Sequence, residues 1–208
     1  MKAILVDNKQ TQERFLNVVD KLYHSDKAYI RPLNQDVEKV FDTNQNPFFK
    51  HGQCVRWILV DDKNKTIGRI AAFVNEKKAY GYEVPTGGVG FFECINDQAA
   101  ANLLFDTTKG WLTEIGMQAM EGPINFGEND SFWGLLVEGF TSASYGMNYH
   151  LPYYHQLFSN YGFSTAYEQI TNIIDLTIPF PARFTKIANW VAAKPGYSFE
   201  YFKKSNAE

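Results

Sequence analysis

The fold is decided by the stretch "GFFECINDQAAANLLFDTTKGWLTEIG", which runs from Gly90 to Gly116. The β-prone run Val89–Ile95 predicts a strand, and apolar residues at helical spacing predict a helix over Ala99–Ile115, which Gly116 would cap. Between them lies the turn Asn96-Asp97-Gln98. A helix that starts at such a turn offers unpaired backbone N–H groups and the positive end of its dipole, which favours the binding of an anion.

The composition is that of an ordinary globular chain of one large domain. Of the 208 residues, 45% are hydrophobic and 21% charged, and the net charge of −3 argues against a nucleic-acid-binding surface. Cys54 and Cys94 are too few for a disulfide framework. Neither a signal peptide nor a membrane span is recognisable, so we expect a cytoplasmic protein without a membrane partner.

The remaining elements complete a mixed order of strands and helices. Thr11 is the expected cap of the first helix, and an irregular insert is expected over Phe126–Leu151. The order predicts an α/β sandwich with a mixed sheet. Strands are expected over Lys2–Asp7, Gln53–Val60, Thr66–Val74, Ala119–Asn125 and Glu168–Ile178, and further helices over Gln35–Phe41, Pro152–Tyr161 and Phe184–Ala193.

Two stretches in this order resemble the GNAT acyltransferase superfamily. The first is Val89–Gly116, and the second is "LPYYHQLFSNYGF", Leu151–Phe163. The set "NPFF", "GFFE", "GPIN" and "NYHLPYY" is similar, more closely, to a bacterial GNAT-like family of largely unassigned activity. The resemblance runs from about Lys2 to Asp175 and implies an α/β (α+β) GNAT-like N-acyltransferase fold, with a mixed central sheet flanked by helices on both faces.

The domain boundaries follow from the same resemblance. We expect a GNAT-like domain over residues 1–180, followed by a C-terminal helix and tail over residues 181–208. Members of the similar family often continue into a second half. The tail is therefore interpreted either as a natural end or as the start of a second half.

The resemblance implies that an acyl-CoA, such as acetyl-CoA, lies where the fourth and fifth strands splay apart. Its pantetheine arm would pair with the backbone of the fourth strand, and its pyrophosphate would lie on the N–H groups at the start of the next helix. No metal is implied. The cofactor-binding residues expected on this basis are Phe92, Cys94, Ile95, Asn96, Asp97, Gln98, Ala99, Ala100 and Ala101.

The loop departs from the superfamily pattern, which has Arg or Gln followed by glycines. Alanine does not readily adopt the positive φ of a wrapped loop. Asp97 adds a negative charge, and as a helix N-cap it would occupy donors that the phosphate needs. A plain Asp-capped helix is therefore the alternative to a CoA loop.

The position of the catalytic acid departs as well. In many enzymes of the superfamily a Tyr four residues before the Gly of "GF" protonates the leaving thiolate, but here that position is Phe158. Tyr154 lies one turn earlier on the same helix face and is the expected acid. Tyr153 and Tyr161 are alternatives.

Glu93 is the candidate general base. It lies within the strand with Phe91 and Ile95 on its face, by the two-residue period. A carboxyl group among apolar neighbours has a raised pKa and can accept a proton from an amine, directly or through water. The alternative is a Glu at the rim of a cleft or hydrogen-bonded to a neighbouring loop.

The insert is the candidate acceptor site. The stretch Gly122–Phe140 combines tight turns, polar groups and aromatic residues, which is typical either of a cleft lining or of a set of Asx turns. The four histidines show no metal-ligand spacing. The residues expected to bind the acceptor are Asn125, Asn129, Trp133, Tyr145, Asn148 and Tyr153.

These expectations combine into an acyltransferase that moves an acyl group from acyl-CoA to an amine by direct transfer. The expected partner is a small-molecule or peptide amine acceptor, and a homodimer is compatible with the sequence. One alternative is a catalytically degenerate GNAT-like domain that binds a ligand or partner through an aromatic cleft. Another is half of a tandem GNAT transferase.

Overall fold

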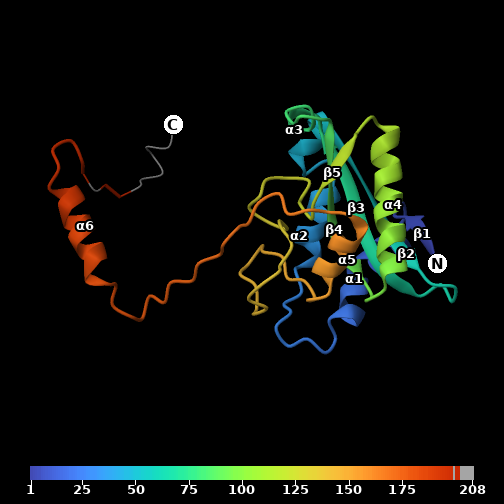
Figure 1. The fold of residues 1–208 in the computed structure, drawn as a ribbon, viewed down its shortest axis with the longest axis horizontal. Coiled ribbons are helices and arrows are strands. Elements are labelled where there is room, and N and C mark those ends of the chain that lie inside the picture. The colour runs from blue at the N-terminus through green and yellow to red at the C-terminus, as the bar shows by residue number, and fades with distance from the viewer. Residues whose placement is uncertain (199, 202–208) are drawn as a thin grey trace. The chain divides into compact units, whose positions relative to one another are not determined.

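The structure, a computed structural model, describes residues 1–198, 200 and 201 of the chain. The chain separates into two compact units, Met1–Tyr167 and Glu168–Glu208. All the strands that the structure describes, and the candidate site, lie in the first unit (Figure 1). The two units are therefore taken in turn.

The first unit is built on a five-stranded sheet in the order β1-β2-β3-β4-β5. Neighbouring strands from β1 to β4 are antiparallel, whereas β5 is parallel to β4, so the sheet is mixed as predicted. The polar turn between β2 and β3 closes the predicted hairpin, with Asp61 accepting backbone N–H bonds from Lys63 and Lys65. The strands are β1 (Lys2–Leu5), β2 (Gly52–Val60), β3 (Thr66–Asn75), β4 (Thr86–Cys94) and β5 (Ala119–Glu121).

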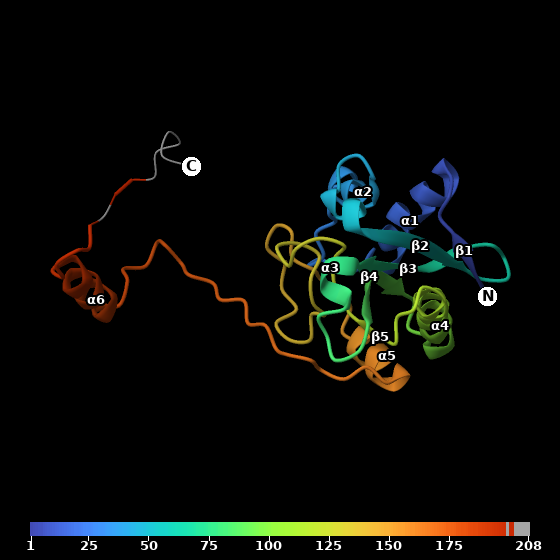
Figure 2. The same cartoon turned by 90° about the horizontal axis from the view of Figure 1, so that it is seen from above.

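Helices cover both faces of this sheet (Figure 2). On one face lie α1 (Lys9–Leu22) and α2 (Asn34–Phe41), and on the other lie α4 (Gln98–Glu114) and α5 (Tyr154–Tyr161). Short pieces, η1 (Pro47–His51) and α3 (Glu76–Ala79), flank the hairpin strands. The core under α4 and α5 includes Ile70, Phe92, Leu104, Phe105 and Phe158, and the core under α1 and α2 includes Phe15, Ile58 and Val60.

The cap of α1 differs from the prediction. Asn8, not Thr11, is the N-cap: its side chain accepts the Thr11 amide at 3.0 Å, while the Thr11 hydroxyl accepts the Asn8 amide at 3.3 Å. This reciprocal pair is a capping box. The polar residues between the two fit the first turn of the helix, so α1 begins three residues before the position expected from Thr11.

Strand β5 is shorter than predicted. It pairs with β4 only through Thr86↔Ala119, Gly87↔Met120 and Gly88↔Glu121. The next peptide bond, Gly122–Pro123, is cis, and proline has no N–H to continue a ladder. The strand predicted to extend to Asn125 therefore ends at Glu121.

Strand β4 bends where its partner ends. Its register with β3 shifts between Arg69 and Ala71, which are opposite Glu93 and Gly90, so β4 carries a bulge. Phe91 in the bulge has a φ of 51°, which is rare for a bulky residue. Beyond the bulge, the edge of β4 that faced β5 is open.

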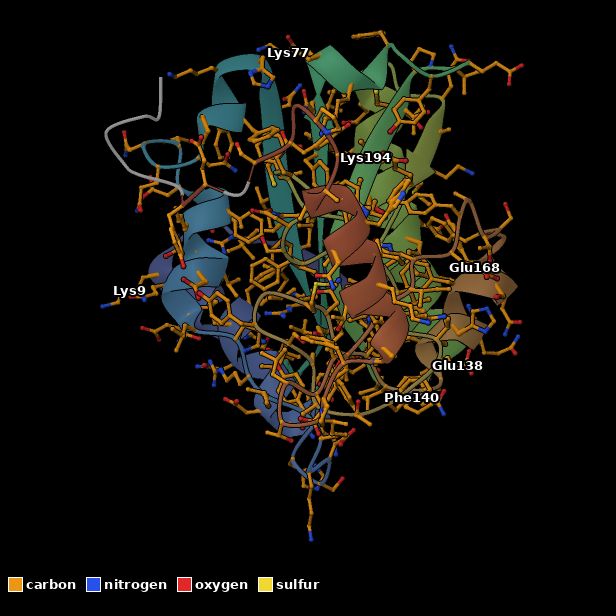
Figure 3. The ribbon with its side chains drawn as sticks, turned by 90° about the vertical axis from the view of Figure 1, so that its left-hand side faces the viewer. Lys9, Lys77, Glu138, Phe140, Glu168 and Lys194 are labelled. Carbon is orange, nitrogen blue, oxygen red and sulfur yellow. The ribbon has the colours of Figure 1, made fainter. Side chains whose placement is uncertain are left out.

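A long irregular connection runs from Gly122 to Tyr153. Glu138 and Phe140, labelled in Figure 3, lie near its middle. Phe126, Tyr149 and His150 on this connection are buried, so its two ends are anchored in the first unit. This is the irregular insert expected from the sequence.

The second unit contains α6 (Ala182–Ala192), close to the predicted helix. The strand predicted over Glu168–Ile178 is wrong: this run has no ladder partner in the described structure. Ile170, Ile173 and Leu176 are exposed. Alternating apolar residues predict a strand, but a strand forms only where another backbone accepts its hydrogen bonds.

Candidate functional site

The candidate site lies at the end of β4, around the buried carboxyl group of Glu93. Oε2 of Glu93 accepts hydrogen bonds from the hydroxyl groups of Tyr23 and Tyr154, both at 2.8 Å. Oε1 lies 3.4 Å from Nη2 of Arg69. These four side chains form the Glu93 cluster, and all of them are buried.

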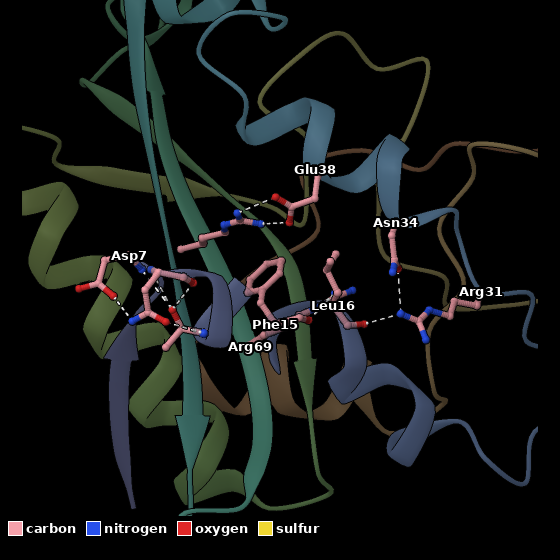
Figure 4. A network of polar contacts seen from close by, with 10 residues as sticks. Asp7, Phe15, Leu16, Arg31, Asn34, Glu38 and Arg69 are labelled. Atoms are coloured by element: carbon pink, nitrogen blue, oxygen red, sulfur yellow. Dashed lines mark hydrogen bonds and ion pairs between the residues drawn. The ribbon is translucent and has the colours of Figure 1, made fainter. Parts of the chain in front are cut away.

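Each member of the Glu93 cluster comes from a different element. Tyr23 is the C-cap of α1, Arg69 is opposite Glu93 on β3, and Tyr154 is the first residue of α5. Arg69 also donates from Nη1 to the Phe15 carbonyl oxygen at 2.8 Å, which ties it to α1 (Figure 4). The cluster therefore joins the sheet to the helices on both of its faces.

Burial and mutual contacts shift the pKa values of the titratable side chains in the Glu93 cluster. Burial raises the pKa of the Glu93 carboxyl above its ordinary value, against the opposing effects of the Arg69 charge and of the hydrogen bonds from Tyr154 and Tyr23. Burial, followed by the charge of Glu93, raises the pKa of Tyr154 and of Tyr23. Both phenols are therefore neutral hydrogen-bond donors at neutral pH.

The open edge of β4 is served by tyrosine side chains. The backbone amide of Cys94 donates to the Tyr154 hydroxyl at 3.0 Å, and the Tyr153 hydroxyl donates to the Cys94 carbonyl oxygen at 2.7 Å. A neighbouring strand, or a pantetheine arm, would use these same two backbone groups. Any such ligand must displace the two hydroxyl groups.

The start of α4 is a capped helix N-terminus. Asp97 is its N-cap, and its carboxylate accepts the Ala100 amide at 2.9 Å. The Gln98 side chain bridges to α5 by donating to the Leu157 carbonyl oxygen at 3.1 Å. In the part of the chain that the structure describes, the first-turn amides of Gln98 and Ala99 have no protein acceptor.

Comparison with known proteins gives a structural likeness and one distant relative. No sequence model of a known protein family matches the chain. Protein YghO of Escherichia coli (strain K12) is 28% identical over 148 residues. The match covers 71% of this chain but only 37% of that protein.

Solved acetyltransferases share the architecture. A predicted acetyltransferase with acetyl-CoA from Clostridium acetobutylicum superposes with a TM-score of 0.50 and 12% identity, over 83% of this chain and 95% of that one. The chain has a GNAT-like fold. An aminoglycoside antibiotic 6'-N-acetyltransferase from Acinetobacter baumannii has a TM-score of 0.49 and 9% identity, over 84% and 98% of the two chains.

Within the GNAT-like fold, the residues predicted around the loop divide into two groups. Ala100 and Ala101 are buried, so their side chains belong to the core, whereas Asn96 and Ala99 are exposed. Ile95 packs against the core under α4, not on the Glu93 side as predicted, because β4 ends at Cys94 and the two-residue period ends with it. Phe92 also lies in that core.

The residues predicted for the acceptor scatter. Asn125 is buried, and its Oδ1 has no hydrogen-bond partner among the described residues. The Trp133 indole donates to Tyr167, the Asn148 side chain to the Gly134 carbonyl oxygen, and the Tyr145 hydroxyl to Asp36 of α2. Tyr145 and Asn129 are exposed. Of this set, Tyr153 alone donates a hydrogen bond to the open edge of β4 among the described residues.

Two members of the cluster were missed by the sequence analysis. Arg69 is the one charged residue within the apolar strand that contains it, which is a signal for a buried pair. Tyr23 lies on the apolar stripe of α1 and gives no such signal, because a core tyrosine and a hydrogen-bonding tyrosine fit the same spacing.

His150 is also buried, and burial lowers its pKa to about 3, so it is neutral near Tyr154.

The other features near this site are limited. Phe158 packs edge-to-face in the core with Phe92 and Phe105, consistent with its lack of a proton to donate. No three His, Cys, Asp or Glu side chains in the described part of the chain could hold a metal ion together. None of the described helices is both long and apolar enough to cross a membrane. A cavity of about 250 Å³ lies at the other end of α4, lined by Leu112, Met117, Met120, Tyr161 and Phe163 among others.

Proposed function

We propose that the protein is an acyltransferase that moves an acyl group from acyl-CoA to an amine acceptor by direct transfer. The observation that carries this proposal is the open edge of β4 beyond Gly90, after the Ile124 amide has donated to the Val89 carbonyl oxygen, with Glu93 and Tyr154 hydrogen-bonded at the opening. A GNAT-like fold with a titratable pair at a strand opening suits acyl transfer more than a purely structural role.

Glu93 and Tyr154 together account for every proton transfer in the proposed reaction. The acceptor amine gives its proton to the Glu93 carboxylate as its nitrogen forms the new bond to the acyl carbon. Tyr154 protonates the leaving thiolate, and Glu93 then returns a proton to Tyr154 across their 2.8 Å hydrogen bond. The raised pKa of Glu93 suits it to accept a proton, as a general base must.

The remainder of acyl-CoA would contact backbone groups. The Cys94 amide and carbonyl would take the pantetheine arm after the Tyr153 hydroxyl moves and Tyr154 gives up the Cys94 amide while keeping its hydrogen bond to Glu93, and the first-turn amides of α4 would take the pyrophosphate. Asp97 already occupies the Ala100 amide and adds a negative charge. We therefore expect weaker binding of acyl-CoA than a glycine-rich loop would give.

Calorimetric titration with CoA and with acetyl-CoA at neutral pH tests the proposal. We expect saturable heat and a rise in melting temperature with both ligands. A Tyr161→Phe variant is the matched control, because Tyr161 lies at the far end of α5, where its hydroxyl donates to Asp106 of α4, and its loss should not affect binding. No heat and no thermal shift at millimolar ligand would exclude acyl-CoA as the substrate.

A second candidate is a domain without catalysis that binds a ligand through aromatic side chains. It is favoured by a partly buried cluster of Phe41, Phe91 and Phe132, whose neighbouring ring centroids lie 5.0 and 5.1 Å apart at the bulge of β4. If CoA does not bind, Phe132→Ala tests this candidate. Loss of a fluorescence response to aromatic amine probes would support it, and an unchanged response would reject it.

A further inference from the structure

The Glu93 carboxyl is held from both faces of the sheet through one oxygen atom. Oε2 accepts from Tyr154 of α5 and from Tyr23 of α1, each at 2.8 Å. Oε1 has only the longer 3.4 Å contact to Arg69. A charged acceptor with two short hydroxyl donors on one oxygen is fixed in its rotation by those donors.

Tyr23 is itself fixed in place. Its ring stacks on Tyr29, with centroids 3.9 Å apart and planes 11° apart, and meets the Tyr149 ring at 6.1 Å. Its backbone N–H donates to the Val19 carbonyl at the end of α1. The side chain is 3% exposed. Its hydroxyl therefore reaches Glu93 from a rigid support and not from a mobile loop.

Helix α1 also supports the second partner of the carboxyl. The Phe15 carbonyl accepts from Arg69 at 2.8 Å, and the Arg69 guanidinium lies 4.8 Å from the centroid of the Phe15 ring. Arg69 and Tyr23, the two donors on the α1 side, are thus both set by this helix. We propose that Tyr23 is a positioning residue that holds the Glu93 carboxyl in the orientation used at the opening of β4. This inference rests on the proposed role of Glu93 as a base.

Other titratable groups face the same space and bear on the test. Besides Tyr23, two side chains affect the pKa of Glu93: Arg69 on β3 and Tyr154 on α5. Burial, with a smaller effect from the Glu93 charge, in turn raises the pKa of Tyr153, the N-cap of α5, and of Cys94 on β4. Tyr29 also senses the Glu93 charge. Because the Arg69 charge favours the carboxylate independently of Tyr23, loss of the Tyr23 hydroxyl should shift the pKa of Glu93 without abolishing its titration.

The direct experiment is a ¹³C NMR titration of glutamate-labelled protein, with the Glu93 signal assigned by its absence in Glu93→Gln. In Tyr23→Phe the ring and its stack remain, but one donor to the carboxylate is lost, so the titration midpoint of Glu93 should move upward. Tyr29→Phe is the matched control, since it preserves the same stack and has no hydrogen bond to Glu93. It should leave the midpoint in place.

A second variant keeps the test decisive if Tyr23→Phe folds poorly. Replacement of Tyr23 by 3-fluorotyrosine retains the hydrogen bond and makes the hydroxyl a stronger donor, so the midpoint should move downward. An unchanged midpoint with fluorotyrosine, or equal upward shifts in Tyr23→Phe and Tyr29→Phe, would overturn the role of Tyr23.

The failure of this inference is separable from the failure of the proposed function. The NMR titration needs no ligand, whereas the acyltransferase proposal fails on the absence of acetyl-CoA binding to the unmodified protein. If acetyl-CoA binds and Tyr23→Phe keeps its affinity within about twofold while the Glu93 midpoint moves, Tyr23 acts on the carboxyl and not on the cofactor. An affinity loss above tenfold without a shift of the midpoint would assign Tyr23 to the ligand instead.

Discussion

The two halves of β4 show opposite ways of using a strand edge. The first half runs from Thr86 to Gly90: Thr86–Gly88 pairs with β5, and Val89 accepts a hydrogen bond from the Ile124 amide just beyond β5. Around this pairing, the chain is pressed so closely that a Cβ on Gly88 would lie 2.1 Å from the Phe73 ring, and one on Gly90 1.9 Å from the Ile124 carbonyl oxygen. In the second half, Phe91–Cys94 has no strand beside it, and the hydroxyl groups of Tyr153 and Tyr154 serve the Cys94 backbone. In the first half, glycines allow the neighbouring backbone to pack directly against β4. In the second half, tyrosine side chains occupy the place of the missing strand.

A ligand site can form in a sheet where a strand edge is left without a backbone partner. Backbone ladders leave no polar group for a ligand, because each N–H and C=O is already paired. Beyond the bulge at Phe91, backbone groups on one edge of β4 have no strand partner. Side chains, which can move, form hydrogen bonds with these groups instead. Substitutions in the two halves should therefore differ in kind: electrostatic and pH-dependent in the open half, steric in the paired half.

The largest effect is expected from Arg69→Met in the open half. The variant leaves the Glu93 carboxylate buried without its charge partner, which typically costs about 3–5 kcal/mol of unfolding free energy. Urea unfolding at pH 7 measures it. The exposed pair Lys78–Glu128 provides the control, because Lys78→Met should change stability little.

The loss in Arg69→Met should depend on pH in a defined direction. The folded pKa of Glu93 lies above its unfolded value, so its contribution to stability is fully present below the unfolded pKa and falls as pH rises through the folded pKa. Removing Arg69 raises the folded pKa further and enlarges that fall. The loss should be smallest near pH 4 and largest at neutral pH, and an equal loss at both would contradict a charged Glu93.

The next largest effect is expected in the paired half, from Gly90→Ala. The new methyl group would meet the Ile124 backbone, which cannot yield as a side-chain end can, so we expect a loss at the upper end of overpacking costs, about 3 kcal/mol. Gly110→Ala on α4 is the control of opposite sign. It has open space around it and should stabilise the helix by roughly 0.5–1 kcal/mol. Neither change in unfolding free energy should vary with pH.

The sequence predicts the open half of β4 but neither its paired half nor the end of β5. Alternation and helical spacing predict β2, β3 and α4 to within one residue at each end, because those elements bury continuous apolar faces. Strand β4 begins at Thr86 and not at Val89 as predicted, because the glycines that precede Val89 give no strand pattern. The end of β5 at Glu121 follows from Pro123, which has no N–H to continue the ladder, and coincides with a close approach at Gly122, whose Cβ would lie 2.3 Å from the Val89 carbonyl oxygen. No local pattern reports such a contact.

The candidate site was predictable to a similar extent. The strand period points to Glu93, and Tyr154 follows from the resemblance to the GNAT superfamily together with a shared helix face; the structure joins the two side chains at 2.8 Å. The acceptor residues predicted on the insert follow no period, and the structure does not bring them together. Tyr23 comes from a helix 70 residues away in sequence. Its role arises from packing of α1 on the sheet, so spacing alone could not identify it.

A moderate effect on stability is expected from Asp97→Ala, at the helix start beside the open half. Loss of the N-cap should cost about 1 kcal/mol of unfolding free energy. The same change frees the Ala100 amide and removes a negative charge, so acetyl-CoA affinity should rise while stability falls. Asp97→Asn, which retains a cap acceptor without the charge, separates the two causes, and an unchanged affinity in both variants would remove α4 from the proposed phosphate site.

The smallest effect is expected from Tyr82→Phe, at the outer edge of the paired half. The Tyr82 hydroxyl donates to Glu121 at 2.6 Å, and partial burial, followed by the bond to Glu121, raises the pKa of Tyr82 to about 12. The side chain is 45% exposed, so water can replace the lost bond, and urea unfolding should change by less than about 0.5 kcal/mol. Tyr154→Phe removes a hydroxyl of similar geometry from a buried carboxylate and should cost about 1.5–3 kcal/mol. Equal losses of unfolding free energy in the two variants would contradict the idea that burial strengthens the hydrogen bonds from tyrosines to Glu93 in the open half.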